Sequence, residues 1–210
     1  MRIKPDDSEF EDAENIIESS VEKASKELGV RTEPSIGLGY THKPFTKNTL
    51  GGVSGETFED GKVDIRFNSE VDGWKENLRR TMAHEYAHTH FFQIKPRNSN
   101  DELWKVILGE AQATNLAEKC FPNAEPPTIS AVTQEELREY WSKVKNLMEE
   151  EMGWNNRVFF SDFYNSEIPM YYGYSLAFRI GRELLKEYCL EEFADLGKVD
   201  VINTGDGLFK

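Results

Sequence analysis

The segment from residue 72 to about residue 92 constrains the fold more than any other part of the chain, because it must form a helix that buries one face. Its apolar side chains recur every four residues, at Trp74, Leu78, Met82 and Tyr86. This spacing is typical of an amphipathic helix. The same segment holds three of the four histidines of the chain. We therefore expect a core helix that also carries chemically active groups.

The residues before this helix follow two patterns. Residues 8–28 have apolar side chains at spacings of three and four, which predicts an amphipathic helix with an acidic outer face. Short segments rich in strand-forming residues then predict strands at 35–40, 51–58 and 62–68. A turn sequence, Glu59-Asp60-Gly61, separates the last two strands. We therefore expect these two strands to form a hairpin.

Helices are expected in the remainder of the chain. Two capping boxes, Ser99 with Glu102 and Thr133 with Glu136, predict the starts of two helices. A last helix is expected over about residues 174–188. Strands first and helices after them are typical of the α+β class.

Length and composition exclude several classes of protein. No repeat or Pro/Gly-rich linker divides the 210 residues, so a single domain over residues 1–210 is expected. The chain has 38 acidic and 25 basic side chains without a cluster of Lys and Arg, so we expect no nucleic-acid partner. No apolar run approaches the roughly 18 residues of a membrane span, and no signal peptide is recognisable. We expect a cytoplasmic protein with no membrane partner, in which Cys120 and Cys189 are buried free thiols.

The helix of residues 72–92 contains His84-Glu85-Tyr86-Ala87-His88, the pattern H-E-x-x-H. Histidines at positions i and i+4 project from one helix face about 6 Å apart, so both imidazoles can bind one tetrahedral zinc ion. Glu85 is rotated about 100° from His84, which sets its carboxylate beside the metal rather than on it. There it can take a proton from a water held by the metal. The motif therefore predicts a catalytic zinc site.

A third zinc ligand is expected from the next helix. Glu110 stands in the middle of a mainly apolar stripe, where a carboxylate requires a partner. About 6 Å of helix follow His88, and about 13 Å separate the next helix start near Asp101 from Glu110. If the loop reverses the chain, the two helices run antiparallel and Glu110 comes alongside the histidines. Asp101 remains an alternative ligand if the loop folds back sharply, although its position also suits a helix cap.

The other two histidines are set aside. His90 follows His88 by two residues and points to another side of the helix. A longer motif with a third histidine is excluded, because Phe91 and Ile94 occupy the positions of its glycine and histidine. His42 lies in a Pro-containing loop, where we expect an exposed residue. The expected ligands of one Zn²⁺ are therefore His84, His88 and Glu110.

The motif H-E-x-x-H with Glu110 placed 22 residues after His88 resembles the gluzincin arrangement of the zincin-like metallopeptidases. Over a longer span, LRRTMAHEYAHTHFF, GEAQATNLAEKC and IPMYYGYSLAFRIGRELL resemble the "predicted Zn-dependent protease" family of archaea and bacteria. This resemblance covers about residues 60–190, the expected core of the metal site. It implies an α+β, zincin-like fold in which a small, mostly antiparallel sheet packs on a helical core. It also implies a metalloprotease, a hydrolase whose substrate is a peptide or protein.

The resemblance assigns roles to further residues. It puts the Tyr-Gly-Tyr segment near the site, and Tyr174 is the preferred donor to the oxyanion of the transition state, with Tyr172 and Arg179 as alternatives. The strand of residues 63–68 precedes the zinc helix, as the substrate-aligning edge strand does in zincins. Thr114 stands where thermolysin-like enzymes have a carboxylate that orients a zinc histidine, so this support must differ or come from elsewhere.

The predicted function is zinc-dependent hydrolysis of a peptide bond, with Glu85 as the base. The stretch GEAQATNLAEKCFP also resembles the Glu-x-x-Ala pattern of metalloproteases that cleave bacterial repressors. A regulatory protease specific for one protein partner is therefore an alternative. Two non-enzymatic functions also fit the sequence: a binding module that zinc stabilises without catalysis, and an interaction domain without metal.

Overall fold

The computed structural model describes residues 7–98, 101–122, 128–149, 158–159 and 167–210. Contacts within the chain divide it into two compact units. The first unit comprises Met1–Gln93 and Leu116–Pro126, and the second comprises Ile94–Asn115 and Pro127–Lys210. The expected single domain over residues 1–210 stays a prediction.

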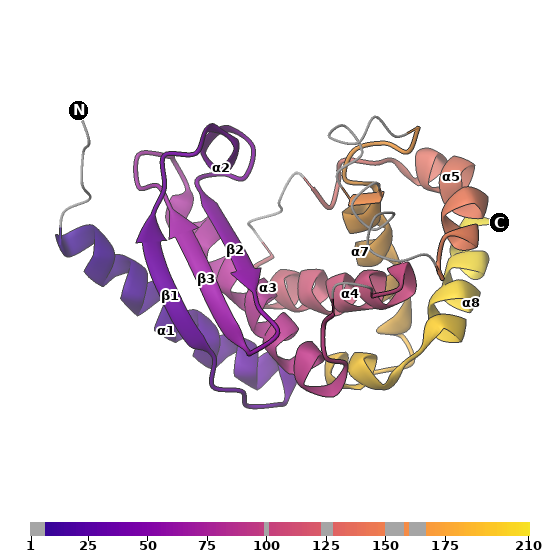
Figure 1. Ribbon diagram of the computed structural model, residues 1–210, viewed down its shortest axis with the longest axis horizontal. Helices are drawn as coiled ribbons and strands as arrows, with labels where there is room; N and C mark the ends of the chain where they lie inside the picture. The colour runs from indigo at the N-terminus through magenta and orange to yellow at the C-terminus, as the bar shows by residue number, and fades with distance from the viewer. Residues whose placement is uncertain (1–6, 99–100, 123–127, 150–157, 160–166) are drawn as a thin grey trace. The chain divides into compact units, whose positions relative to one another are not determined.

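Three strands form the sheet of the first unit: β1 (Ser35–Tyr40), β2 (Val53–Thr57) and β3 (Lys62–Phe67). Their order is β1-β3-β2, with β1 parallel and β2 antiparallel to β3 (Figure 1). The three predicted strands and the hairpin of the last two are confirmed. The expectation of a mostly antiparallel sheet is wrong, because one of the two strand pairs is parallel.

The mixed sheet results from the connection between β1 and β2, which includes the short helix α2 (Pro44–Asn48). This connection reverses the chain and passes the end of β3, so that β3 enters between the other two strands. Buried Asn68, at the end of β3, joins both sides: its N–H donates to Gly52 O at 2.8 Å and its Nδ2 donates to Thr41 O at 2.9 Å. The strand of residues 63–68 is therefore central. Its expected role as an edge strand is wrong, since β1 and β2 are the edges.

Helices α1 (Asp7–Leu28) and α3 (Trp74–Ile94) cover one face of this sheet (Figure 1). Buried Phe67 of β3 contacts Phe10 of α1 and Trp74 of α3, with ring centroids 5.3 and 5.2 Å apart. Both predicted helices are confirmed. Every member of the predicted apolar stripe of α3 is at most 8% exposed, namely Trp74, Leu78, Met82 and Tyr86. Because burying one such side chain contributes roughly 1.5–3 kcal/mol, this stripe anchors α3 in the core.

Residues 103–115 of helix α4 (Leu103–Cys120) belong to the second unit, together with α5 (Gln134–Asn146), α7 (Tyr172–Leu184), η2 (Leu190–Asp195) and α8 (Lys198–Phe209). The capping box of α5 is confirmed: Glu136 N donates to Thr133 Oγ1 at 3.3 Å, and Thr133 N donates to Glu136 Oε2 at 2.8 Å. The box predicted at Ser99 lies outside the described residues. The last predicted helix, expected over about residues 174–188, is confirmed as α7, which begins at residue 172 and ends at residue 184.

Helix α8 is not indicated by the sequence pattern, since it contains Gly205 and Gly207, which disfavour a helix interior. Packing outweighs this preference. Trp141 of α5 lies so close to Gly205 that a Cβ there would be 2.2 Å from Trp141 Cη2. Trp141 Nε1 donates to Asp206 Oδ1 at 2.9 Å, and Lys145 Nζ lies 2.5 Å from Asp206 Oδ2. Hydrogen bonds to the Asp206 carboxyl, the strongest of them from Lys145, hold its pKa below the usual range.

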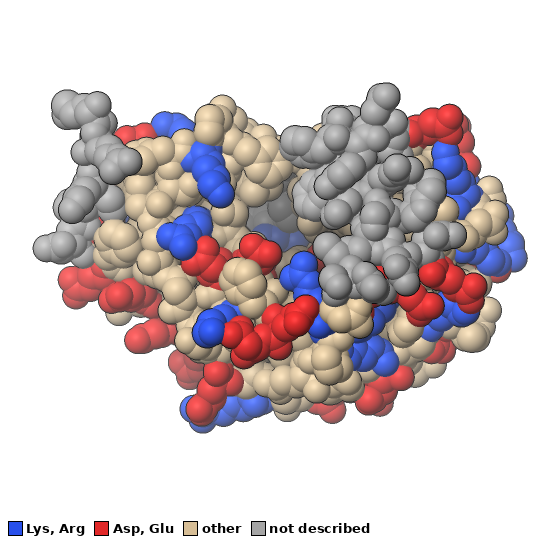
Figure 2. All heavy atoms as spheres, viewed as in Figure 1, with Lys and Arg blue, Asp and Glu red and all other residues tan. Residues whose placement is uncertain are grey.

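None of the described helices combines the length and the apolar composition that crossing a membrane requires. On the face shown in Figure 2, Lys and Arg side chains are interspersed with Asp and Glu. Both cysteines are free thiols, as predicted. Cys120 is buried as expected, but the expected burial of Cys189 is wrong: it is exposed, because it precedes η2 as its N-cap residue instead of lying inside a helix.

Candidate metal centre

The two histidines of the motif lie one turn apart on α3. Their Nε2 atoms are 3.1 Å apart, and their ring centroids are 4.8 Å apart with an interplanar angle of 80°. Two nitrogen ligands of a tetrahedral zinc ion, each at about 2.0–2.1 Å from the metal, are about 3.3 Å apart. His84 and His88 thus have nearly the separation that one shared ion requires. The prediction that both imidazoles project from one helix face is confirmed.

Packing restrains the second histidine. His88 is 8% exposed, and its ring stacks on that of Phe92, with centroids 5.3 Å apart and planes 9° apart. His84 is half-buried. A ring held in this way loses little rotational freedom when it binds a ligand, which favours a preorganised site.

The carboxylate of Glu85 lies against strand β2. Glu85 is 6% exposed, and its Oε2 accepts a hydrogen bond from Thr57 Oγ1 at 2.7 Å. Two residues earlier on β2, a Cβ at Gly55 would lie 2.7 Å from Glu85 Oε1. Sequence reasoning missed Thr57 and Gly55, because these contacts join residues 28 and 30 positions apart. The available signal was the shared face of Val53, Gly55 and Thr57 in a strand.

The two acidic alternatives for the third ligand differ in their surroundings. Asp101 is buried, and both of its carboxylate oxygens are engaged: Oδ1 with Lys105 Nζ at 2.6 Å and Oδ2 with Asn98 N at 3.1 Å. These contacts favour a structural role for Asp101. Glu110 lies half-buried in the middle of α4. Among the described residues, His84, His88 and Glu110 form the group with suitable donor atoms for one metal ion.

Thr114 does not supply the missing support for a histidine. It is 3% exposed, and its Oγ1 donates to Glu110 O, one turn earlier on α4, at 2.6 Å. The Thr114 hydroxyl therefore donates its proton to the backbone of its own helix, a common arrangement for threonine in helices, and not to a histidine.

The three residues considered as oxyanion donors belong to α7. Tyr172 is fully buried, and its hydroxyl donates to Leu137 O at 2.8 Å. Burial raises the pKa of Tyr172 above its usual value. Because the Tyr172 hydroxyl already donates to a buried main-chain oxygen, Tyr172 is no longer an alternative donor to the oxyanion. Arg179 is exposed, and Tyr174 is half-buried with its ring centroid 4.8 Å from that of Phe159. The role of Tyr174 stays a prediction.

The remaining histidines have different environments. His42 is exposed, as predicted, and its ring centroid lies 5.0 Å from that of Tyr40. His90 is 4% exposed and belongs to the buried part of α3. Neither is a member of the group that could hold the ion.

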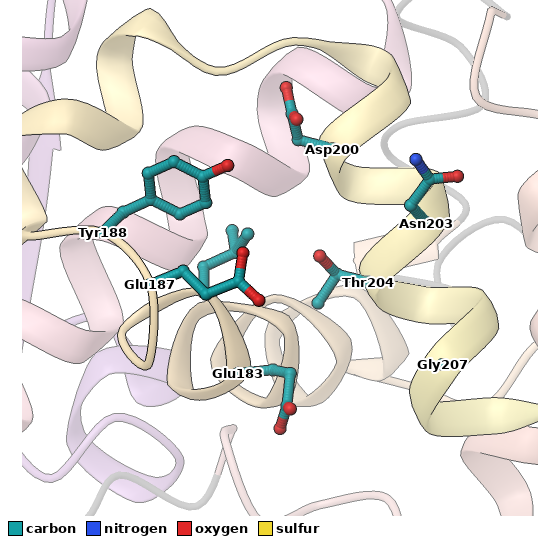
Figure 3. Close-up of a pocket in the computed structure, with 8 residues that line it drawn as sticks. Glu183, Glu187, Tyr188, Asp200, Asn203, Thr204 and Gly207 are labelled. Atoms are coloured by element: carbon teal, nitrogen blue, oxygen red, sulfur yellow. The ribbon is translucent and has the colours of Figure 1, made fainter.

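A pocket of about 370 Å³ lies in the second unit, where the end of α7 faces α8 (Figure 3). Two of its carboxylates have local partners: Glu183 lies 2.7 Å from Lys186 Nζ, and Asp200 accepts from Gly197 N at 2.8 Å. The lining includes none of the predicted site residues, so this pocket is not the candidate metal centre. Its lining residues are Glu183, Leu184, Glu187, Tyr188, Asp200, Asn203, Thr204 and Gly207.

Fold and motif together define a class: α+β proteins in which a helix packed on a small mixed sheet carries the zinc-binding pattern H-E-x-x-H. The chain belongs to the family described as "Predicted Zn-dependent protease (DUF2268)", whose model matches residues 16–200. This finding confirms the family that the sequence motifs resemble. The expected cofactor, one zinc ion, agrees with the family description and with the group of His84, His88 and Glu110. No curated protein and no solved structure matches this chain significantly.

Proposed function

We propose that this protein is a zinc metallopeptidase of the gluzincin type, in which His84, His88 and Glu110 bind the ion and Glu85 is the general base. The observation that carries the proposal is on α3, where two Nε2 atoms lie 3.1 Å apart and the residue after the first histidine is a buried carboxylate. Paired neutral donors with an adjacent base suit hydrolysis by an activated water. The family description supports peptides or proteins as the substrate class.

Contacts within the first unit support Glu110 as the third ligand. Arg80 Nη1 of α3 donates to Glu118 Oε2 at 2.9 Å and to Phe121 O at 3.3 Å, so the end of α4 lies against this part of α3. His88 follows Arg80 by eight residues, and Glu110 precedes Glu118 by eight residues. Each interval is about 12 Å of helix. If α4 runs antiparallel to α3, as the loop length predicts, these equal intervals bring Glu110 level with His88.

The residues have separate tasks in the proposed reaction. A bound zinc ion supplies Lewis-acid chemistry, since it acidifies water and polarises a carbonyl. The Glu85 carboxylate accepts a proton from the attacking water and returns it to the nitrogen of the leaving amine. His84 and His88 act as neutral ligands. Tyr174 donates a hydrogen bond to the developing oxyanion.

Strand β2 replaces β3 as the strand that aligns the substrate. It is an edge strand of the described sheet, and its inner face contacts Glu85. A peptide can add to such an edge by main-chain hydrogen bonds, which give affinity without strict sequence choice. The substrate backbone would then lie beside the strand that also contacts the base.

Metal analysis and peptide hydrolysis test the proposal. The purified protein should hold about one equivalent of zinc and cleave a fluorescence-quenched peptide library in a chelator-sensitive manner. Glu85→Gln should keep the metal and lower kcat by about 10²–10⁴-fold, whereas His84→Ala and Glu110→Ala should lose the metal. His42→Ala removes an exposed histidine and should change neither property. A zinc content below about half an equivalent would contradict the proposal.

Two different functions would give different results in the same experiments. A regulatory protease leaves generic peptides intact but cleaves one protein of a cell lysate at one site, and Glu85→Gln abolishes this cleavage. A non-catalytic module retains zinc and shows no chelator-sensitive turnover on either substrate.

A further inference from the structure

The inner face of strand β2 contacts the side chain of Glu85 at two positions. Residues alternate between the two faces of a strand, so Val53, Gly55 and Thr57 share one face. The burial pattern agrees, because Val53 and Thr57 are buried whereas Glu56 between them is exposed. Gly55 and Thr57 both lie against Glu85. Neither residue is a metal ligand or a base, so their contact with Glu85 requires its own explanation.

The Thr57 hydroxyl holds one oxygen of the carboxylate. Thr57 Oγ1 lies 2.7 Å from Glu85 Oε2 and 3.1 Å from the main-chain O of Glu85. Because a hydroxyl has one proton, the shorter contact, to the charged acceptor, is the stronger hydrogen bond. Thr57 is 2% exposed and Glu85 is 6% exposed, so water competes weakly for this bond.

The contact at residue 55 requires a glycine. A Cβ there would lie 2.6 Å from Glu85 Cγ, 2.7 Å from Oε1 and 2.9 Å from Cδ, all shorter than any normal contact. Gly55 is not one of the glycines with positive φ. Close approach of Glu85, rather than backbone conformation, therefore explains this glycine.

We infer that Thr57 and Gly55 are positioning residues for the general base, an assignment that rests on the proposed function. A glutamate side chain has several rotatable bonds, and a carboxylate without an anchor samples positions away from the attacking water. Thr57 fixes Oε2, and the bare backbone at Gly55 lets Oε1 lie close to β2. One strand would thereby set the positions of both the base and, through its edge, the peptide.

Kinetics of matched variants test this inference. Thr57→Val keeps the shape of the side chain but removes the donor, and should lower kcat by about 10- to 100-fold with KM within about twofold of the parent. Thr57→Ser restores the donor and should recover most of kcat. Gly55→Ala displaces the carboxylate and should also lower kcat. Zinc content should stay at about one equivalent in all three variants.

Two control variants separate positioning from general loss of structure. Thr32→Val removes another buried threonine hydroxyl, which lies 2.8 Å from Thr89 Oγ1, and should leave kcat unchanged. Gly37→Ala adds a methyl to another strand, where its nearest neighbour would be the end of a side chain, Asp64 Oδ1 at 3.3 Å, and should leave kcat unchanged. If folded Thr57→Val protein has the kcat of the parent, or if Thr57→Ser is as slow as Thr57→Val, the inference is overturned.

A second readout does not depend on turnover. With Co²⁺ in place of zinc, the visible absorption bands report the surroundings of the ion. Thr57→Val should shift these bands in the same direction as Glu85→Gln, and Thr32→Val should not. An unchanged spectrum in Thr57→Val would overturn the inference. If the parent protein binds metal but cleaves nothing, the proposed function fails, and the Co²⁺ spectra alone decide whether Thr57 positions Glu85.

Discussion

Helix α8 contains two glycines whose replacement by alanine should have opposite effects on stability. In a helix interior alanine is favoured over glycine by roughly 0.5–1 kcal/mol, because glycine loses more backbone entropy on folding. A Cβ at Gly207 would have no neighbour within 4 Å. Gly207→Ala should therefore raise the free energy of unfolding by about 0.5 kcal/mol, the lower value because residue 207 lies in the last turn.

At Gly205 the same gain is outweighed by a steric clash. A Cβ there would lie 2.2 Å from Trp141 Cη2 and 2.3 Å from Cζ2. Trp141 cannot easily move aside, because it is 3% exposed and its Nε1 donates to Asp206. Adding a methyl group to such a packed site costs about 1–3 kcal/mol. Gly205→Ala should therefore lower the free energy of unfolding by up to about 2.5 kcal/mol after the gain in helix propensity is subtracted.

Urea unfolding and thermal denaturation, both followed by circular dichroism, measure the two shifts. A change of 1 kcal/mol should move Tm by about 2–4 °C in a chain of this size. Gly205→Ala should thus lower Tm and Gly207→Ala should raise it. If Gly205→Ala raises Tm as much as Gly207→Ala does, Trp141 does not pack on Gly205, and the reasoning is refuted.

Three further predictions concern the tyrosines, the thiols and the metal. Tyr172→Phe should lower the free energy of unfolding by about 1–2 kcal/mol without changing kcat, because Leu137 O loses its donor. Tyr174→Phe should instead lower kcat about 10²–10³-fold. Urea unfolding and steady-state kinetics distinguish the two variants, and a Tyr172→Phe variant with lowered kcat would contradict the assignment. Burial raises the pKa of Cys120 to about 11, so the thiol is protonated at pH 8, and only above that pKa does it become mainly the reactive thiolate. A disulfide reagent at pH 8 should therefore label only exposed Cys189 in native protein and both thiols in denaturant, and fast labelling of both in native protein would count against this burial. Relative to protein with free zinc at about 1,000 times Kd, removal of zinc by a chelator should lower the free energy of unfolding by up to about 4 kcal/mol. Adding zinc back should restore Tm. A Tm that the chelator leaves unchanged would contradict a metal site in the folded state.

The candidate ligand pair on α3 could be predicted because its geometry is local. His84 and His88 are joined by one turn of helix, and the repeat of 3.6 residues sets their separation whatever surrounds them. The apolar stripe that begins at Trp74 predicted the buried face of the same helix for the same reason. Capping at Thr133 is also local, since it needs only four consecutive residues.

Elements that depend on distant partners could not be predicted in this way. Residues 63–68 were expected at the edge of the sheet, but the order of strands depends on the path of the connection through α2, which no pattern within the strand encodes. Helix α8 was not predicted, because glycine is unfavourable in a helix interior. Its contact with Trp141 nevertheless requires a glycine at position 205.

The sequence by itself determined which residues can form the candidate centre: two histidines on one helix face, a glutamate beside them, and a second glutamate that needs a partner. Tertiary structure alone decided what surrounds Glu85. The Thr57 hydroxyl and the bare backbone of Gly55 reach it from a strand, 28 and 30 positions earlier in the chain. A helix sets the direction of a side chain through local dihedral angles, but the contacts of that side chain depend on which distant segment packs there, and packing is a property of the whole fold.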